Sequence, residues 1–201
     1  MRLTERVHHY LNTQLKPGDH AIDATAGNGH DAAHMASLVG PKGQVIAIDI
    51  QKAAIDTTRE RLNTRGCSAQ VQLLTGEHSS ILQSLCSKHA QTICAITFNL
   101  GYLPGSDKHI RTTPETTLRA LDASRQLLNP KGLLLVTAYR GHEGGQAEAN
   151  AVAGWMETLQ AEGCSVESYT PATQGTRTPP ILWIMSLGAS SETFGIQVST
   201  R

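Results

Sequence analysis

Short apolar runs alternate along the chain with longer stretches in which apolar residues recur at helical spacing. The first helical stretch places Leu3, Val7 and Leu11 on one stripe, and residues 45–48 form the clearest apolar run. Such a run is typical of a strand buried on both faces of a parallel sheet. Strands that alternate with helices predict a doubly wound α/β fold with right-handed crossovers.

The pattern divides the chain into seven expected strands and the helices between them. The strands are expected at residues 21–23, 45–49, 70–74, 93–98, 133–138, 164–169 and 181–187. The helices are expected at residues 3–15, 30–38, 52–65, 79–88 and 114–128, with a further one through 149–156. No internal repeat interrupts this order, and 201 residues suit one domain. We therefore expect a single domain over residues 1–201, with its core from about 18 to 188.

Polar residues gather where the expected strands end. Asp23, Asp49, Glu77, Asn99 and Tyr139 each follow or close an apolar run. In an open α/β sheet, ligands bind beyond the carboxyl ends of the strands, near the point where strand order reverses. The sequence therefore predicts a binding site at this edge of the sheet.

The strongest local signal is the turn at residues 23–31, which joins the first strand to a helix. Gly27 and Gly29 let the backbone approach a ligand closely, and the amides of the following helix point toward it. The segment also fits the pattern G-x-G-x-x-[GA], and Asp49 lies 20 residues after Gly29. A dinucleotide-binding fold places its ribose-binding acid at about this distance. An NAD(P)-binding oxidoreductase is therefore one interpretation.

Two features argue against a dinucleotide. Asp23 closes the first strand four residues before Gly27, where a dinucleotide fold usually keeps an apolar residue. An acid there suits a ligand with a cationic amino group. Residues 99–102, Asn-Leu-Gly-Tyr, carry no group for hydride chemistry, but the side-chain oxygen of Asn99 and the carbonyl of Leu100 can accept hydrogen bonds from an amine.

Overall charge gives no argument for a nucleic-acid partner. Lys plus Arg and Asp plus Glu both number 17, so the formal net charge is zero. Such a partner would need a local basic patch or loop, for which the candidates are Lys108, His109, Arg111, Arg140 and His142. His142 is also a candidate for a proton route from an amine.

The cysteines, the histidines and the length of the apolar runs bear on the location of the protein and on metal binding. Cys67, Cys86, Cys94 and Cys164 contain no C-x-x-C pair, so we expect reduced thiols in a cytoplasmic protein rather than a zinc site or disulfides. Apart from the adjacent His8 and His9, the nine histidines show no ligand spacing with acids or cysteines, and we expect no metal. No apolar run approaches membrane-spanning length, so we expect no membrane association.

These residues carry a family resemblance. Asp-x-x-x-Gly-x-Gly, with an acid closing the second strand, resembles class I S-adenosylmethionine-dependent methyltransferases. The fuller set of motifs is similar to a small bacterial family labelled "putative rRNA methylase", whose characterised members methylate the aminomethyl group of 5-aminomethyl-2-thiouridine at the tRNA wobble position. The resemblance covers about residues 4 to 187, and its motifs lie at residues 23–31, 49–51, 99–105, 139–145 and 179–180.

The resemblance implies a Rossmann-like sheet whose last strand is antiparallel, with S-adenosylmethionine as cofactor and tRNA as partner. It implies that Asp49 binds the ribose, that Asp23 lies under the amino-acid end, and that Asn99 holds the amine while Tyr102 stacks on the base. Glu77 and His78 would contact adenine, although either could instead cap the next helix. The remaining implied cofactor contacts are Gly27, Asn28, Gly29, His30 and Gln51.

Other functions stay open on the sequence alone. In the same fold, a methyltransferase of a small-molecule amine or of rRNA remains an alternative, and the neutral charge favours the small amine. Methyltransferases without a separate RNA-binding domain often dimerise, so we also expect a homodimer.

Overall fold

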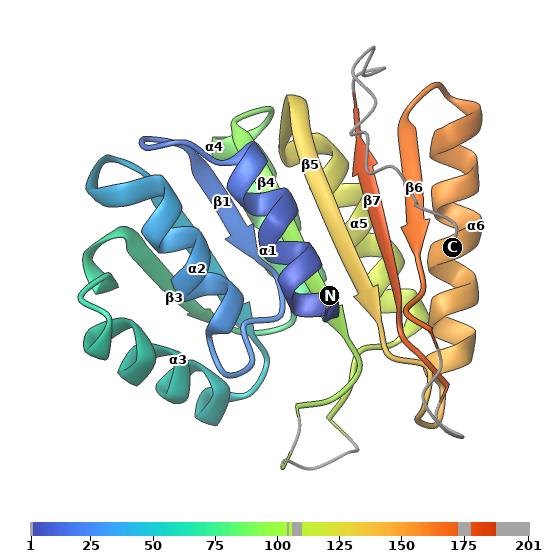
Figure 1. The fold of residues 1–201 in the computed structure, drawn as a ribbon, viewed down its shortest axis with the longest axis horizontal. Helices are drawn as coiled ribbons and strands as arrows, with labels where there is room; N and C mark the ends of the chain where they lie inside the picture. The colour runs from blue at the N-terminus through green and yellow to red at the C-terminus, as the bar shows by residue number, and fades with distance from the viewer. Residues whose placement is uncertain (1, 104, 106–109, 173–177, 188–201) are drawn as a thin grey trace.

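The computed structural model describes residues 2–103, 105, 110–172 and 178–187. Its centre is one seven-stranded sheet with the order β3-β2-β1-β4-β5-β7-β6 (Figure 1). The strands are β1 (His20–Asp23), β2 (Gln44–Asp49), β3 (Val71–Thr75), β4 (Ile93–Leu100), β5 (Leu128–Ala138), β6 (Ser165–Tyr169) and β7 (Ile181–Ser186). The helices are α1 (Leu3–Gln14), α2 (His30–Val39), α3 (Lys52–Thr64), α4 (His78–His89), α5 (Pro114–Leu127) and α6 (Gly145–Ala161), with short 3-10 turns at Gly40–Lys42 and Ser68–Gln70.

The strand pairing confirms the expected fold class. β1 pairs in parallel with β2 on one side and with β4 on the other, so strand order reverses at β1. β7 is antiparallel to both β5 and β6. This is the Rossmann-like sheet of class I methyltransferases, and the reversal at β1 is where such a sheet binds its ligand.

Successive residues of each inner strand support opposite faces of the sheet. Leu134 and Val136 pack in the core formed with α4, α5 and α6, whereas Leu133 and Leu135 pack in the core formed with α1 and α2. Side chains alternate in this way because a strand has a period of two, and a strand covered on both faces must be apolar throughout. The apolar runs of the sequence reflect this double burial.

Two boundaries differ from the sequence prediction. The sequence predicts a strand from residue 133, but β5 already begins at Leu128, which is fully buried and pairs with Ile93 ahead of a register shift. β4 continues through Leu100, so Asn99 lies on the strand rather than in the loop after it. Asn99 is therefore held by strand pairing with Thr137.

None of the helices in the described ranges is both long enough and apolar enough to cross a bilayer.

Candidate active site

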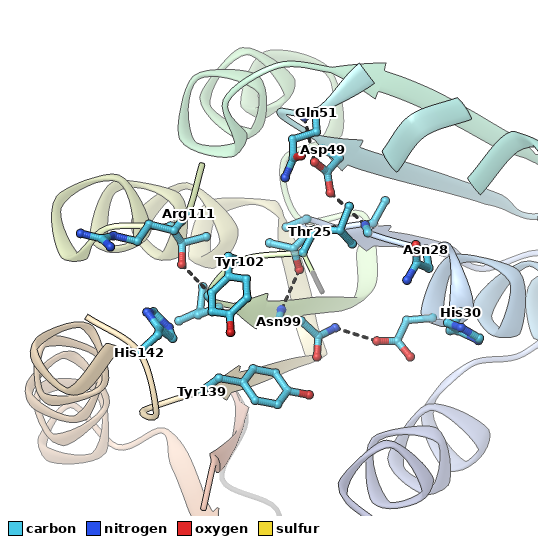
Figure 2. Close-up of a pocket in the computed structure, with 18 of the residues that line it drawn as sticks. Thr25, Asn28, His30, Asp49, Gln51, Asn99, Tyr102, Arg111, Tyr139 and His142 are labelled. Atoms are coloured by element: carbon cyan, nitrogen blue, oxygen red, sulfur yellow. Dashed lines mark hydrogen bonds between the residues drawn. The ribbon is translucent and has the colours of Figure 1, made fainter. Parts of the chain in front are cut away.

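A cavity of about 1200 Å³ opens at the carboxyl ends of the central strands (Figure 2). Most of the predicted site residues line it: Gly27, Asn28, His30, Asp49, Gln51, His78, Asn99, Tyr102 and His142. Asp23, Gly29 and Glu77 are not among its lining residues. The structure therefore brings the two expected halves of the site together, one from the turn at 23–31 and one from the segments after β4 and β5.

The glycine-rich turn is held by α3 from behind. Thr58 donates its hydroxyl to the carbonyl of Gly27 at 3.1 Å, and Arg61 donates Nε to the carbonyl of Asn28 at 2.6 Å. Gly29 has a φ of 74°, and a Cβ placed on it would lie 2.8 Å from the Thr58 side chain. Gly29 therefore fits the turn against α3 rather than facing the cavity.

Asp49 joins the second strand to that turn. One carboxylate oxygen accepts the Gly27 N–H and the other accepts the Gln51 N–H, both at 2.9 Å. Each oxygen keeps a further lone pair, because a carboxylate oxygen can accept two hydrogen bonds. The side chain is thus fixed in place while it can still accept hydrogen bonds from hydroxyl groups in the cavity.

Asp23 lies deeper than the sequence suggested. It is 1% exposed, and one oxygen accepts the Thr25 N–H at 3.3 Å while the other has no hydrogen-bond partner in the described part of the chain. Burial, and then the negative charge of Asp31, raises the pKa of Asp23 well above its ordinary value. Asp23 therefore lies buried beneath the site rather than in its wall, and its surroundings favour the protonated carboxyl group.

Asp31 supplies the negative charge that raises the pKa of Asp23. It was not among the site residues predicted from the sequence. It lines the cavity, and its two oxygens contact Nε2 of His8 and Nδ2 of Asn99, each at 2.8 Å. Burial alone would raise the pKa of Asp31, but the hydrogen bonds from His8 and Asn99 lower it below the ordinary value. An acid in the first turn of a helix is also favoured by the helix dipole, so the sequence alone does not reveal the contact between Asp31 and Asn99.

The opposite wall carries three rings. Tyr102 and His142 meet edge to face, with 5.4 Å between ring centroids, and Tyr139 is 45% exposed beside them (Figure 2). His142 Nδ1 lies 2.9 Å from the Glu143 carbonyl, so this nitrogen carries a proton. Its Nε2 is buried and has no hydrogen-bond partner among the described residues.

A buried glutamate supports this wall from below. Glu148 on α6 is 2% exposed and accepts hydrogen bonds from the hydroxyls of Thr112 at 2.8 Å and Thr117 at 2.7 Å. Thr112 in turn accepts the Gly101 N–H at 2.8 Å. Glu148 therefore connects α6 to the segment that presents Tyr102, and burial raises its pKa.

The residues after β3 take different positions. Glu77 caps α4, accepting from the Ser79 amide at 2.8 Å and the Ser79 hydroxyl at 2.7 Å. His78 is 7% exposed and lies edge-on to Phe98, and its buried Nε2 has no hydrogen-bond partner in the described ranges. Burial lowers the pKa of His78, which favours a neutral imidazole. Of this pair, His78 lines the cavity and Glu77 does not.

The suggested basic patch is described only in part. Lys108 and His109 lie outside the described residues. Arg111 and Arg140 line the cavity, where Arg111 Nη1 lies 3.4 Å from Glu143 and Arg140 donates Nε to the Pro179 carbonyl at 2.9 Å. Both arginines therefore line the cavity, and the charge of Arg111 is paired with the Glu143 carboxylate.

Comparison with known proteins places this geometry among methyltransferases. A family model described as "Putative rRNA methylase" matches residues 45–186, and one described as "Protein-L-isoaspartate(D-aspartate) O-methyltransferase" matches residues 2–81. The crystal structure of a "putative rRNA-methylase" from Clostridium thermocellum is 34% identical, with a TM-score of 0.83 over 92% of this chain and 97% of that one. A protein from Streptococcus mutans described as "a putative methyltransferase", solved in complex with SAH, is 32% identical, with a TM-score of 0.77 over 92% of this chain and 98% of that one.

A curated relative adds a named substrate. The chloroplastic tRNA (mnm5s2U34)-methyltransferase of Arabidopsis thaliana is 38% identical over 159 residues, which cover 75% of this chain and 57% of that protein. The chain spans about half the length of the curated relatives it matches.

Proposed function

Since the chain belongs to the family described as "Putative rRNA methylase", we propose that it is an S-adenosylmethionine-dependent N-methyltransferase. Its proposed reaction converts 5-aminomethyl-(2-thio)uridine to 5-methylaminomethyl-(2-thio)uridine at the wobble position of tRNA. The observation that carries the proposal is Asn99 at the end of β4, with its amide directed into a cavity beside the glycine-rich turn.

The residues present fit S-adenosylmethionine. Asp49 retains lone pairs for the ribose hydroxyls, and the buried Nε2 of His78 is available for a polar contact with the adenine. The backbone at Gly27 and Asn28 lines the cavity, where the methionine portion would approach it. The cofactor supplies a methyl group on a sulfonium, which an amine nucleophile attacks in line.

The wall opposite the glycine-rich turn, which carries Tyr102, Tyr139 and His142, is here called the acceptor wall, and it is suited to a neutral amine. An aminomethyl group is largely protonated at neutral pH and must lose that proton before it can attack. Asn99 can accept a hydrogen bond from the amine and direct its lone pair toward the methyl group, which is a positioning effect. Tyr102 and the exposed Tyr139 offer ring faces on which a base can stack. The unpartnered Nε2 of His142 is a candidate acceptor for the departing proton.

The choice of tRNA rests on the Arabidopsis relative, whose name states that substrate. Arg111 and Arg140 line the cavity and support a polyanionic partner even though the formal net charge is zero. A small-molecule amine is the second candidate, and the same zero net charge favours it. The oxidoreductase interpretation receives no support from the relatives named above, all of which are described as methylases or methyltransferases.

The test is nucleoside mass spectrometry on tRNA from a strain that lacks this protein, incubated with the purified chain and S-adenosylmethionine. Gain of one methyl group on 5-aminomethyl-2-thiouridine supports the proposal. If no nucleoside gains a methyl while the cofactor still binds, the tRNA substrate is wrong and a small amine becomes the better candidate. Binding to tRNA that weakens steeply with salt would separate the two, because phosphate contacts release counterions.

Two further expectations belong to this proposal. We propose a homodimer, which a monomer mass in solution at working concentration would contradict. A cytoplasmic location stays a prediction, and the name of the Arabidopsis relative places that protein in the chloroplast instead.

A further inference from the structure

Asn99 is held at two points by the glycine-rich turn. Its backbone N–H donates to the Thr25 hydroxyl at 2.7 Å, and its side-chain Nδ2 donates to Asp31 Oδ2 at 2.8 Å (Figure 2). Among the described residues, no hydrogen bond is donated to its Oδ1. In Figure 2 this oxygen points toward the side of the cavity where Tyr139 lies.

The partner of Nδ2 determines which end of the amide faces the cavity. A carboxylate can only accept hydrogen bonds, so it selects the nitrogen of the Asn99 amide and turns the oxygen away from itself. With the amide reversed, two N–H donors would face the substrate amine, which must instead donate. The oxygen of the Asn99 amide must therefore face the cavity. Only then can the amine donate a hydrogen bond to it and keep its lone pair free to attack the methyl group.

Asp31 is in turn held through both of its carboxylate oxygens. His8 on α1 contacts the second carboxylate oxygen at 2.8 Å, and His34 stacks on His8 with 3.9 Å between ring centroids. The side chain of Asp31 is 10% exposed, so water offers it little alternative. Three elements, α1, α2 and β4, thus meet at one carboxylate.

We propose that Asp31 is a positioning residue, which holds the Asn99 amide with its oxygen toward the substrate amine, and that His8 holds Asp31 in place. The inference rests on the proposed methyl transfer to an amine. It assigns Asp31 an effect on catalysis that acts through Asn99 rather than through contact with the reacting atoms.

A double-mutant cycle tests the proposal with Asp31→Asn, Asn99→Ala and the double variant. The measurement is single-turnover methyl transfer at saturating S-adenosylmethionine. Asparagine at position 31 can present either end of its amide, so the orientation of Asn99 is no longer fixed. A misplaced reacting group costs on the order of 100-fold in rate, and we expect Asp31→Asn to lose about 10- to 100-fold. In the Asn99→Ala background, the same substitution should have almost no further effect, because coupled residues are not additive.

Asp56→Asn is the matched control, because it makes the same change on a surface carboxylate of α3 whose side chain is 42% exposed. It should leave the transfer rate unchanged. Equal losses from Asp31→Asn in both backgrounds would overturn the proposal, since Asp31 would then act independently of Asn99. An unchanged rate in the single variant, or a defect confined to cofactor affinity, would also overturn it.

A readout that does not use activity separates this inference from the proposed function. In the wild-type chain, the side-chain NH2 of Asn99 should give a hydrogen-bonded NMR signal that shifts on Asp31→Asn and not on Asp56→Asn. If that shift occurs but no acceptor is methylated, the proposed function fails while the orientation of Asn99 stands. If methyl transfer occurs and the NH2 signal does not shift, the positioning role fails by itself.

Discussion

The two walls of the cavity are built differently. On the cofactor wall, formed by the turn at 23–31 and the end of β2, Asp49 and two side chains of α3 hold the turn backbone through hydrogen bonds of 2.6–3.1 Å. On the acceptor wall, His142 Nε2 lacks a partner in the described part of the chain, and Tyr139 is 45% exposed. The first wall is preorganised by the fold, and the second has groups that a substrate can satisfy.

The family matches follow the same division. The isoaspartate O-methyltransferase model ends at residue 81, before Asn99 and before the segments that carry Tyr102 and Tyr139. The rRNA methylase model continues through β7. The two models overlap over residues 45–81, which include the end of β2 but not the turn at 23–31. Function resides in the site and not in the fold, so enzymes with different acceptors should differ most in the acceptor wall. The acceptor wall is therefore where specificity of this chain should be sought.

The largest expected effect is on the cofactor wall, from Asp49→Ala. The substitution removes two acceptors of backbone N–H groups as well as the predicted ribose contact. Hydrogen bonds to charged groups are worth about 1.5–3 kcal/mol each, so we expect affinity for S-adenosylmethionine to fall by about 100-fold or more. Titration calorimetry measures this, with Asp56→Ala as the surface control. Cofactor affinity within a factor of about three of wild type would contradict the assignment of Asp49.

An effect of comparable size, but on stability, is expected from Gly29→Ala. Alanine would combine a φ of 74° with a Cβ 2.8 Å from Thr58, and we expect a loss of about 2–4 kcal/mol in the free energy of unfolding. Gly18→Ala is the matched control, because Gly18 has a φ of 96° but no heavy atom within 4 Å of the point where its Cβ would lie. Urea denaturation should show the larger loss at Gly29. Equal losses would mean that contact with α3 contributes nothing.

The predicted residues that line the cavity are those whose position follows from a local pattern. Asp49 and Gly27 could be predicted because a strand end and a tight turn leave a pattern within a few residues. Asp31 could not be linked to Asn99 or His8, which lie 68 and 23 residues away in the chain, because those contacts depend on how α1 and α2 dock on the sheet.

Buried acids were the other difficulty. The strand that leads to Asp23 is apolar on both faces, so it lacks the alternation of apolar and polar residues that would show which way the Asp23 side chain points. Glu148 lies on the inner side of α6 among apolar residues, and a single acid in such a stripe gives no sign of its threonine partners. In both cases the position follows from packing that no local pattern records.

On the acceptor wall, Gly101→Ala should impair transfer while sparing the cofactor. Gly101 has a φ of 142°, and an added Cβ would lie 3.2 Å from Nε2 of His142, which would have to move. We expect the methyl transfer rate to fall about tenfold, as for a modest misplacement of catalytic groups, with cofactor affinity unchanged. Parallel calorimetry and single-turnover assays measure the two quantities. A loss of cofactor affinity comparable to that of Asp49→Ala would show that the two walls are not independent.

The smallest expected effect is a difference in pH dependence between two neighbouring acids, Asp23 and Asp31. The folded-state pKa of Asp23 is raised, so its contribution to stability is complete below the unfolded pKa of about 3.9 and is lost as pH rises through the folded value. The folded-state pKa of Asp31 is lowered, so its contribution is present above about 3.9 and is lost as pH falls through its folded value. Asp23→Asn should therefore gain stability relative to wild type as pH rises, whereas Asp31→Asn should lose it.

Urea denaturation of both variants and the wild-type chain, from pH values below the unfolded aspartate pKa of about 3.9 up to mildly alkaline pH, measures these slopes. The opposite signs are the informative result, because a general loss of packing would shift both variants in the same direction at every pH. Slopes of the same sign would mean that the negative charge is not held at Asp31. The cofactor wall would then lack the fixed carboxylate from which the orientation of Asn99 follows.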